Sequence, residues 1–381
     1  MHRYLDCNAT CPPLEEALAA FLKAAREYPG NPSSLHWAGR AARRELEDAR
    51  EKLAAFVHAE PGSVVFTSGG TEADNIAIQG ALAEAHPGQI VTTAIEHPAV
   101  LQPLERWQSA SAREAGWQVV LVRPDASGVV PAAEMISRIT AETRLVCMML
   151  ANNETGAIQP VAEVAAYCRK LGVPMLVDAV QALGKMSVDF TALAADFMAL
   201  SAHKIGGPKG VGVLLVRRGV KLRELAPGGG QERKRRSGTE NVPGIAGFAA
   251  ALGVIDFAGL AAVRDHFERR LLEDLPEATI FSATAERLPN TSMLSLPGMD
   301  GETLLMQLDL AGFAVASGSA CSSGKREPSH VLLAMGCSQE VARSSIRISF
   351  GPGSAIGDAE ALVAELLRIR QRLQAMAGIT A

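Results

Sequence analysis

The sequence is short of aromatic residues, of long apolar runs and of closely paired cysteines. The last two shortages each exclude a class of protein. Aromatic residues make up only 4% of the 381 positions. No stretch reaches the roughly 20 apolar residues that a membrane-spanning helix needs, and the nearest one, Gly247–Val263, is interrupted by Asp256. The N-terminal stretch "MHRYLDCNAT" lacks the apolar core of a secretory signal peptide. We therefore expect no membrane partner.

Six cysteines are too few for a disulfide framework in so long a chain. None of them forms a C-x-x-C motif, so we expect a reducing, cytoplasmic location. Cys7 and Cys11 are four residues apart, but no further Cys/His cluster completes a four-ligand zinc site, and no resident metal is predicted. The net charge of −4 gives no general attraction to nucleic acid, so none is expected as a partner.

Apolar segments alternate with helical segments between about residues 60 and 220. Several of these segments are apolar throughout, as in strands that helices cover on both faces. The pattern predicts an α/β fold with a mostly parallel, seven-stranded sheet. The predicted strands are 63–68, 89–94, 117–122, 144–150, 173–180, 196–202 and 210–218, and the helices between them are 71–84, 98–114 and 161–171.

The character of the sequence changes near residue 256. A charged helix leads to two short strands and a closing helix, at 261–275, 291–297, 345–351 and 358–376. This order predicts a second, smaller α/β domain, and the chain is long enough for two domains of ordinary size. We expect a large domain of residues 14–255 and a small domain of residues 1–13 and 256–381.

Ligands of open α/β sheets bind where strands end, so the residues after each strand carry the candidate chemistry. After the first strand, "FTSGGTEADN" opens a helix with a Gly-rich turn at Gly70 and Thr71, whose free backbone N–H groups suit an anion. The turn matches neither G-x-x-x-x-G-K-[ST] nor G-x-G-x-x-G, and alone it is more simply an ordinary capped helix start. His97 and Asn153 follow the second and fourth strands, where structural roles are also common.

The fifth and sixth strands end in a carboxylate and an amine. Asp178 ends an apolar run, with Gln181 three residues later, and a buried carboxylate requires a cationic partner. Ser201, His203 and Lys204 precede a run of glycines. A lysine at a buried strand end becomes a nucleophile when its pKa is lowered.

A single ligand accounts for all of these groups. Pyridoxal 5'-phosphate presents an aldehyde to a lysine, a ring nitrogen to a carboxylate, a phosphate to Gly, Ser and Thr, and a flat ring for stacking. The loop 228–244 adds Ser237 and Thr239, which suit a phosphate, beside the basic run 233–236. The sequence therefore predicts a pyridoxal-phosphate site.

Several motifs, in this order, resemble the cysteine desulfurases of the NifS/IscS type, which are class V aminotransferases of pyridoxal-phosphate fold type I. The motifs run from "YLDCNAT" near the start to "SSIRISFG" near the end, so they span nearly the whole chain. Between them lie "FTSGGTEADN", "NNETG", "DAVQ", "SAHK" with "GPKG", "GGGQER", "SGTENVPG" and "SGSACSSG" with "EPSHVL". The resemblance implies conversion of L-cysteine to L-alanine by a homodimer.

The resemblance also implies a role for each candidate residue. Lys204 would hold the cofactor covalently, and Asp178 would keep its ring nitrogen protonated. His97 would stack on the ring and move protons, and Gln181 would hydrogen-bond the ring hydroxyl. The phosphate side would be formed by Gly70, Thr71, Ser201, His203 and, from a second subunit, Thr239.

Cys321 lies in "ASGSACSSGK", among small residues where a structural cysteine is unexpected. The resemblance implies a long, mobile loop in the small domain, from which the Cys321 thiolate attacks the substrate sulfur and leaves as a persulfide. That thiolate would also be able to ligate a cluster iron transiently. Asn153 would contact both cofactor and substrate, and Arg347 would bind the substrate carboxylate by a two-pronged salt bridge.

Two positions depart from the family's usual pattern. Cys11 stands where a second threonine is usual, and Lys234 stands where a small residue is usual. Neither position has a chemical role in that pattern, although the first lies in the segment that would pack near the small domain.

The residues leave other functions open. A transaminase needs no cysteine, so Cys321 argues against that activity, whereas a selenocysteine lyase acts on a substrate of nearly the same shape. A non-catalytic scaffold would not need Lys204, Asp178, His97 and Cys321 together. The sequence does not identify the sulfur acceptor, whether an iron–sulfur scaffold or another protein. It also does not separate a housekeeping role from one dedicated to nitrogenase.

Overall fold

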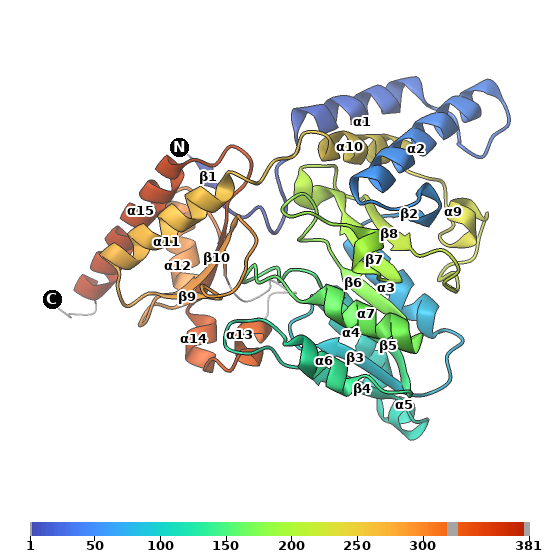
Figure 1. Cartoon of the computed structure of the whole chain (residues 1–381). Helices are drawn as coiled ribbons and strands as arrows, with labels where there is room; N and C mark the ends of the chain where they lie inside the picture. Colours follow the sequence, from blue (N-terminus) through green and yellow to red (C-terminus); the bar gives the residue numbers. More distant parts are fainter. Residues whose placement is uncertain (1, 318–326, 377–381) are drawn as a thin grey trace.

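The computed structural model describes residues 2–317 and 327–376. The described chain forms two lobes, a larger one around a seven-stranded sheet and a smaller one around a four-stranded sheet (Figure 1). None of the helices within these two ranges combines the length and the apolar character of a membrane span.

The strands of the larger sheet are β2 (Val64–Thr67), β3 (Gln89–Thr93), β4 (Gln118–Val122), β5 (Thr143–Met149), β6 (Met175–Asp178), β7 (Phe197–Ser201) and β8 (Gly212–Val216). Their order in the sheet is β2-β8-β7-β6-β5-β3-β4. The five neighbouring strands β4, β3, β5, β6 and β7 run parallel to one another, while β8 is antiparallel to both of its neighbours, β7 and β2. The predicted mostly parallel, seven-stranded sheet is confirmed.

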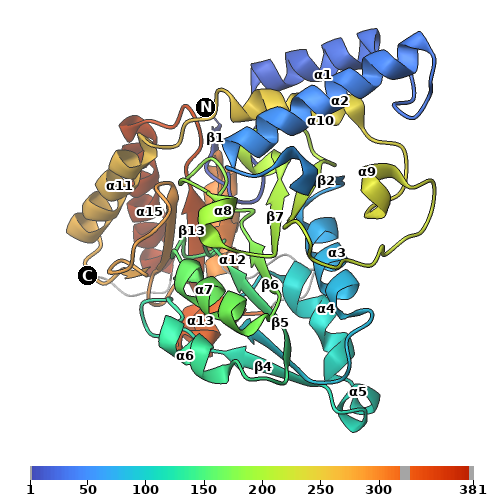
Figure 2. The same cartoon turned by 45° about the vertical axis from the view of Figure 1, so that its right-hand side comes forward.

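Both faces of this sheet are apolar, because successive side chains of a strand point to opposite sides. In β5, Leu145 and Cys147 face one side, Val146 and Met148 face the other, and all four are buried. The first side is covered by α3 (Gly70–Leu82) and α4 (Pro98–Gln108). The second side is covered by α2 (Trp37–Phe56), α6 (Ala132–Arg138), α7 (Val161–Leu171) and α10 (Val242–Leu252). α1 (Glu15–Glu27) packs against α10, which packs in turn against α2, at one end of the larger lobe, as both views show (Figure 2).

The predicted helix 98–114 is wrong in one respect, because the chain breaks at Ser109 into α4 and α5 (Ala110–Glu114). Ser109 has extended backbone angles, and its Oγ accepts a hydrogen bond from the backbone N–H of Ala112 at 3.3 Å, which caps α5. The predicted helix 161–171 is confirmed as α7, and 71–84 corresponds to α3. Short helical turns occur at η1 (Pro61–Ser63), α8 (Phe190–Leu193), η2 (Ala202–Ile205) and α9 (Gln231–Lys234).

The sheet of the smaller lobe is antiparallel, with β9 (Thr279–Phe281), β10 (Thr291–Ser295), β12 (Ala316–Ser317) and β13 (Ser345–Ser349) in the order β12-β13-β10-β9. Its core is formed with α11 (Leu260–Asp274), α12 (Gly301–Leu310) and α15 (Ile356–Met376). α13 (His330–Ala334) and α14 (Gln339–Arg343) lie at the side facing the larger lobe, and Val331 of α13 packs into the larger lobe's core (Figure 1).

The N-terminal segment is part of the smaller lobe. β1 (Arg3–Tyr4) pairs in parallel with β11 (Phe313–Ala314), and Asp6 forms a β-bridge to Ser349. Leu5, Cys7 and Cys11 are buried in the same apolar core as α11 and α15. The domain boundaries at residues 14 and 256 stay a prediction.

Candidate active site

A cavity of about 250 Å³ lies at the carboxyl ends of β5, β6 and β7. Parallel strands bring these ends to one edge of the sheet, so polar residues far apart in sequence meet there. Thr239 does not line the cavity and is exposed in the loop after α9. The other predicted cofactor-binding residues all line it: Gly70, Thr71, His97, Asn153, Asp178, Gln181, Ser201, His203 and Lys204.

Lys204 reaches this cavity from η2, directly after β7. Its Nζ donates hydrogen bonds to the backbone carbonyls of Asn8 at 2.6 Å and Ala9 at 3.0 Å. Burial, and next the positive charge of Arg347, lower the pKa of Lys204 to about 8. A much larger fraction of this amine is therefore neutral near pH 7 than in an exposed lysine, as a nucleophile requires.

Asp178 is the last residue of β6 and is buried. Its Oδ1 accepts a hydrogen bond from the backbone N–H of Val180 at 2.9 Å. Burial raises the pKa of Asp178 to about 6, against the lowering effect of that hydrogen bond and of the Lys204 charge. No cation of the described residues lies within salt-bridge distance of Asp178, so the cationic partner expected from the sequence is not supplied by this part of the chain.

Two further carboxyl groups interact with Asp178 that the sequence reasoning did not single out. Asp74 and Glu96 are 1% and 0% exposed. Burial raises the pKa of both, that of Glu96 to about 8, and the charge of Asp178 contributes to both increases. Glu96 is therefore mainly protonated near pH 7 and Asp178 mainly ionised, while the pKa of Asp74 is shifted in the direction that favours its neutral form.

His97 caps the N-terminus of α4, and its Nδ1 accepts a hydrogen bond from the backbone N–H of Ala99 at 3.1 Å. Burial, and next the charge of Lys204, lower the pKa of His97 to about 4. The imidazole is therefore neutral near pH 7. Since Nδ1 is an acceptor, the proton resides on Nε2.

The groups predicted to bind a phosphate gather at the N-terminus of α3. A Cβ at Gly70 would lie 2.6 Å from Cγ2 of Val180, so this position favours glycine. The buried Ser201 Oγ has no hydrogen-bond partner among the described residues. His203 contributes Nδ1, which lies 3.2 Å from Thr10 Oγ1. Free helical N–H groups and an unpartnered hydroxyl together suit an anion.

Arg347, on β13, is held at the edge of the site by two interactions. One guanidinium nitrogen donates to the backbone carbonyl of Asn153 at 3.0 Å, and the other pairs with Oδ1 of Asp6 at 2.7 Å. Its buried Nε has no partner among the described residues, and neither has Oδ1 of Asn153. The Nε–H of Arg347 is therefore a free hydrogen-bond donor. Beside it, another carboxylate would be able to replace Asp6 in the salt bridge to the guanidinium.

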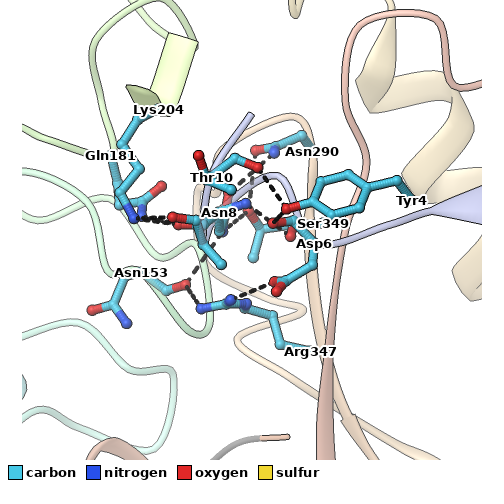
Figure 3. Close-up of polar contacts among 12 residues, drawn as sticks. Tyr4, Asp6, Asn8, Thr10, Asn153, Gln181, Lys204, Asn290, Arg347 and Ser349 are labelled. Atoms are coloured by element: carbon cyan, nitrogen blue, oxygen red, sulfur yellow. Dashed lines mark hydrogen bonds and ion pairs between the residues drawn. The ribbon is translucent and has the colours of Figure 1, made fainter. Parts of the chain in front are cut away.

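Asn8 joins the two lobes at the cavity, and the sequence reasoning missed it (Figure 3). It is 1% exposed, and its backbone carbonyl accepts from both Lys204 and Gln181. Its side-chain and backbone N–H groups donate to three other residues, Asn153, Thr291 and Ser349, and its Oδ1 accepts from Asn290 and Lys185. The motif "YLDCNAT" marked this segment, but its contacts depend on residues that are distant in sequence.

Cys321 lies outside the described residues, so its predicted position is not addressed by the structure. The chain that follows is anchored to the larger lobe, where Ser329 Oγ donates to Glu154 Oε2 and His330 Nε2 lies 3.0 Å from the carbonyl of Glu96. Within the described ranges, no group of three or more His, Cys, Asp and Glu side chains is arranged to hold a metal ion.

The basic run 233–236 is not simply a solvated loop. Arg233 and Arg235 donate to the carbonyl of Gly62, and Arg236 pairs with Glu72 at 2.9 Å. Glu232 just before it is buried and pairs with Arg50 at 2.7 Å. The backbone of Glu232, Arg233 and Lys234 is left-handed, with φ between 46° and 62°.

The residues present fit pyridoxal phosphate. A lysine of lowered pKa, an ionised carboxylate and a neutral imidazole line one cavity. Ser201 Oγ and Asn153 Oδ1 in its lining, and Nε of Arg347 beside Asn153, are buried and have no partner among the described residues, so each is available to a ligand.

Comparison with known proteins gives one consistent family. The family described as aminotransferase class-V matches residues 3–362. A cysteine desulfurase of Trichormus azollae is 39% identical over 380 residues, covering 98% of this chain and 94% of its own length. The solved structure of a NifS-like protein superposes with a TM-score of 0.89 at 35% identity, covering 97% of this chain and 100% of that one. A structure of SspA in complex with cysteine superposes with a TM-score of 0.82 at 28% identity, covering 93% and 100%.

Proposed function

Since this chain belongs to the aminotransferase class-V family and is a pyridoxal-phosphate-dependent cysteine desulfurase, we propose that the cavity residues divide its reaction as follows. The proposal is carried by one observation, that Lys204, Asp178 and His97 line a single cavity at the carboxyl ends of parallel strands. The bound cofactor supplies an electron-withdrawing ring that stabilises negative charge at the substrate α-carbon. The residues of the chain would bind and orient the cofactor and the substrate, and they would exchange protons with the substrate.

The cofactor would be held at each of its polar groups. Lys204 would bind the aldehyde carbon, Asp178 the ring nitrogen and Gln181 the ring hydroxyl. Because Asp178 is buried without a cation from the described chain, a protonated ring nitrogen would complete its salt bridge. The phosphate would be held by Gly70, Thr71, Ser201, His203 and Thr239 of a second subunit.

The substrate would be held by Arg347 and Asn153. The carboxylate of L-cysteine would replace Asp6 on the guanidinium and use the free Arg347 Nε, and Oδ1 of Asn153 would also gain a partner. His97 is neutral and carries its proton on Nε2, so in this tautomer it offers a hydrogen-bond donor; to move a proton to and from the reacting carbon it would first have to accept one at Nδ1, in place of the Ala99 N–H.

Sulfur would leave through Cys321. Its thiolate attacks the substrate sulfur, so that an S–S bond forms while the substrate C–S bond breaks. The carbon keeps the electron pair and takes up a proton to give alanine, and Cys321 keeps the sulfur as a persulfide. We propose a homodimer in the cytoplasm that passes this sulfur to an iron–sulfur scaffold or another acceptor protein.

The test is mass spectrometry of the holoenzyme after one equivalent of L-cysteine. The extra sulfur should be found on Cys321, and Cys321→Ser should bind the cofactor but release neither sulfide nor alanine. Cys337→Ser is the matched control, because Cys337 is a partly exposed free thiol, and it should behave as the wild type. An extra sulfur on Cys337, or normal turnover by Cys321→Ser, would contradict the proposal.

A further inference from the structure

Lys185 is a buried lysine for which the proposed reaction has no use. It is 6% exposed, and no carboxylate of the described residues lies within salt-bridge distance of it. Its Nζ donates to Oδ1 of Asn8 and to Oε1 of Gln181, both at 2.7 Å, and lies 5.6 Å from the centre of the Phe257 ring. Burying a cation without a carboxylate is unfavourable, so its retention calls for a physical reason.

The contact with Gln181 decides which end of that amide faces the cofactor cavity. The ammonium form of Lys185 has donors and no acceptor, and the Asn8 carbonyl that meets the other end of the amide has only an acceptor, so the amide end that meets Lys185 is the oxygen. The amide nitrogen then points away from Lys185, and one of its two hydrogens is donated to the carbonyl of Asn8 at 2.9 Å. Since Gln181 lines the cavity, its second N–H is left for a ligand there.

We propose that Lys185 is a positioning residue that fixes Gln181 as a hydrogen-bond donor toward the ring hydroxyl of the bound cofactor. This rests on the proposed function, in which Gln181 faces that hydroxyl. A donor favours the ionised oxygen, so it lowers the pH at which the bound cofactor loses its proton. Without Lys185 only the Asn8 carbonyl holds the amide in this orientation, so the amide turns more readily and presents its oxygen, which would repel the same ionised group.

The surroundings of Lys185 bring its pKa close to neutrality, so both its charged and its neutral forms occur near pH 7. Burial, and next the charge of Lys204, lower the pKa of Lys185 to about 7; Arg347 acts in the same direction, and the Cys7 and Cys11 thiols oppose it. The ammonium has donors only and enforces this orientation of Gln181, whereas the neutral amine keeps two N–H groups but gains an acceptor lone pair and enforces the orientation less strongly above about pH 7.

The test is a pH titration of the visible absorption of the bound cofactor in the holoenzyme. Lys185→Met should raise the midpoint of the colour change by about half to one pH unit and weaken cofactor binding about threefold to tenfold, as expected for one lost hydrogen bond. The variant should fold, because methionine has a similar length and Asn8 Oδ1 keeps its hydrogen bond from Asn290, so only Gln181 Oε1 loses its donor.

The controls separate this mechanism from a general loss of structure. Gln181→Met should shift the midpoint in the same direction, and the double variant Lys185→Met/Gln181→Met should shift it no further, because Lys185 acts through Gln181. An unshifted midpoint in Lys185→Met, or additive shifts in the double variant, would overturn the proposal. If Lys185→Met does not fold, Lys185→Arg keeps donors at this position and should keep the wild-type midpoint, and a shift in that variant would count against the proposal.

If the assignment of Gln181 to the ring hydroxyl is itself wrong, the variants give a different set of midpoints. If Gln181→Met itself leaves the midpoint unchanged, Gln181 does not face the ring hydroxyl, and the proposed cofactor contacts are wrong. If Gln181→Met shifts the midpoint while Lys185→Met does not, the cofactor contacts stand and the positioning role of Lys185 is refuted.

Discussion

Replacing Glu232 by glutamine tests whether a buried ion pair holds the loop that leads to Thr239. Glu232 and Arg50 are 5% and 2% exposed and form two hydrogen bonds, at 2.7 and 2.9 Å. Glu232 also accepts from the backbone N–H of Phe66 at 2.9 Å. The pair therefore ties the left-handed turn at Glu232 to α2 and β2, the helix and strand that precede the cofactor site in sequence.

The size of the effect follows from what remains after the substitution. Of two charge-assisted hydrogen bonds, each contributing about 1.5–3 kcal/mol, one keeps a neutral acceptor and the other is lost, because the amide NH2 of glutamine meets an Arg50 N–H donor. Arg50 keeps its contacts to Glu47 and to the carbonyl of Val64, and the glutamine amide is able to accept from Phe66 as before. We expect Glu232→Gln to lower the free energy of unfolding by about 3 kcal/mol, at the lower end of the 3–5 kcal/mol typical of a broken buried pair.

The assay is urea unfolding followed by tryptophan fluorescence, which reports on the larger lobe because Trp37, Trp107 and Trp117 all lie there. Arg50→Met/Glu232→Leu removes both charges and should recover most of the lost stability, since apolar replacement of a whole buried pair is nearly neutral. The reasoning is refuted if Glu232→Gln costs less than about 1 kcal/mol, or if the double variant is as unstable as the single one.

Three further outcomes are expected. Asp178→Asn should lower alanine release by orders of magnitude while leaving the fold intact, because the electron-withdrawing ring needs its nitrogen protonated; near-normal alanine release, measured by chromatography, would disprove this role. Capture of added pyridoxal phosphate by the cofactor-free protein, trapped with borohydride, should speed up about tenfold per pH unit up to about pH 8 and then level off. Only the neutral Lys204 amine attacks, and its pKa is lowered to about 8. A rise continuing to pH 10, or labelling retained in Lys204→Ala, would contradict the assignment, and Lys209→Ala is the control that should label normally. Mixed dimers of Lys204→Ala and Thr239→Ala chains should regain the activity of one site, and inactive verified hybrids would argue against shared sites.

The sheet and most of the cavity were predictable because they depend on local patterns. Each strand of the larger sheet is a short apolar run, and the predicted residues that line the cavity lie close after such runs, so the topology of parallel strands brings them together. The break at Ser109 was not predictable from apolar spacing, because a serine cap competes with helix continuation through a single hydrogen bond.

Other parts depend on contacts between distant segments. In the sequence Asn8 cannot be told from an ordinary turn residue. Its role follows only from its hydrogen bonds with Lys185, Gln181 and Asn290, which are distant in sequence. In the sequence Glu232 is one charge among several in a polar loop. In the fold it forms an ion pair with Arg50, which is 182 positions away in sequence. No local pattern marks either residue as buried, since burial of a polar group is decided by its partner.

The crossing of the N-terminal segment into the smaller lobe has a consequence for biosynthesis. Arg3 pairs with Phe313 and Asp6 with Ser349, so these residues wait for partners that are made much later. At ~5–20 residues per second, a ribosome reaches Ser349 roughly 20–70 s after Asp6. During that interval the larger sheet is already complete in sequence, but Asn8 has no Ser349, Asn290 or Thr291 to hold it over Lys204. The cofactor site is therefore closed among the last events of synthesis, and a nascent chain that stalls before β13 carries an open one.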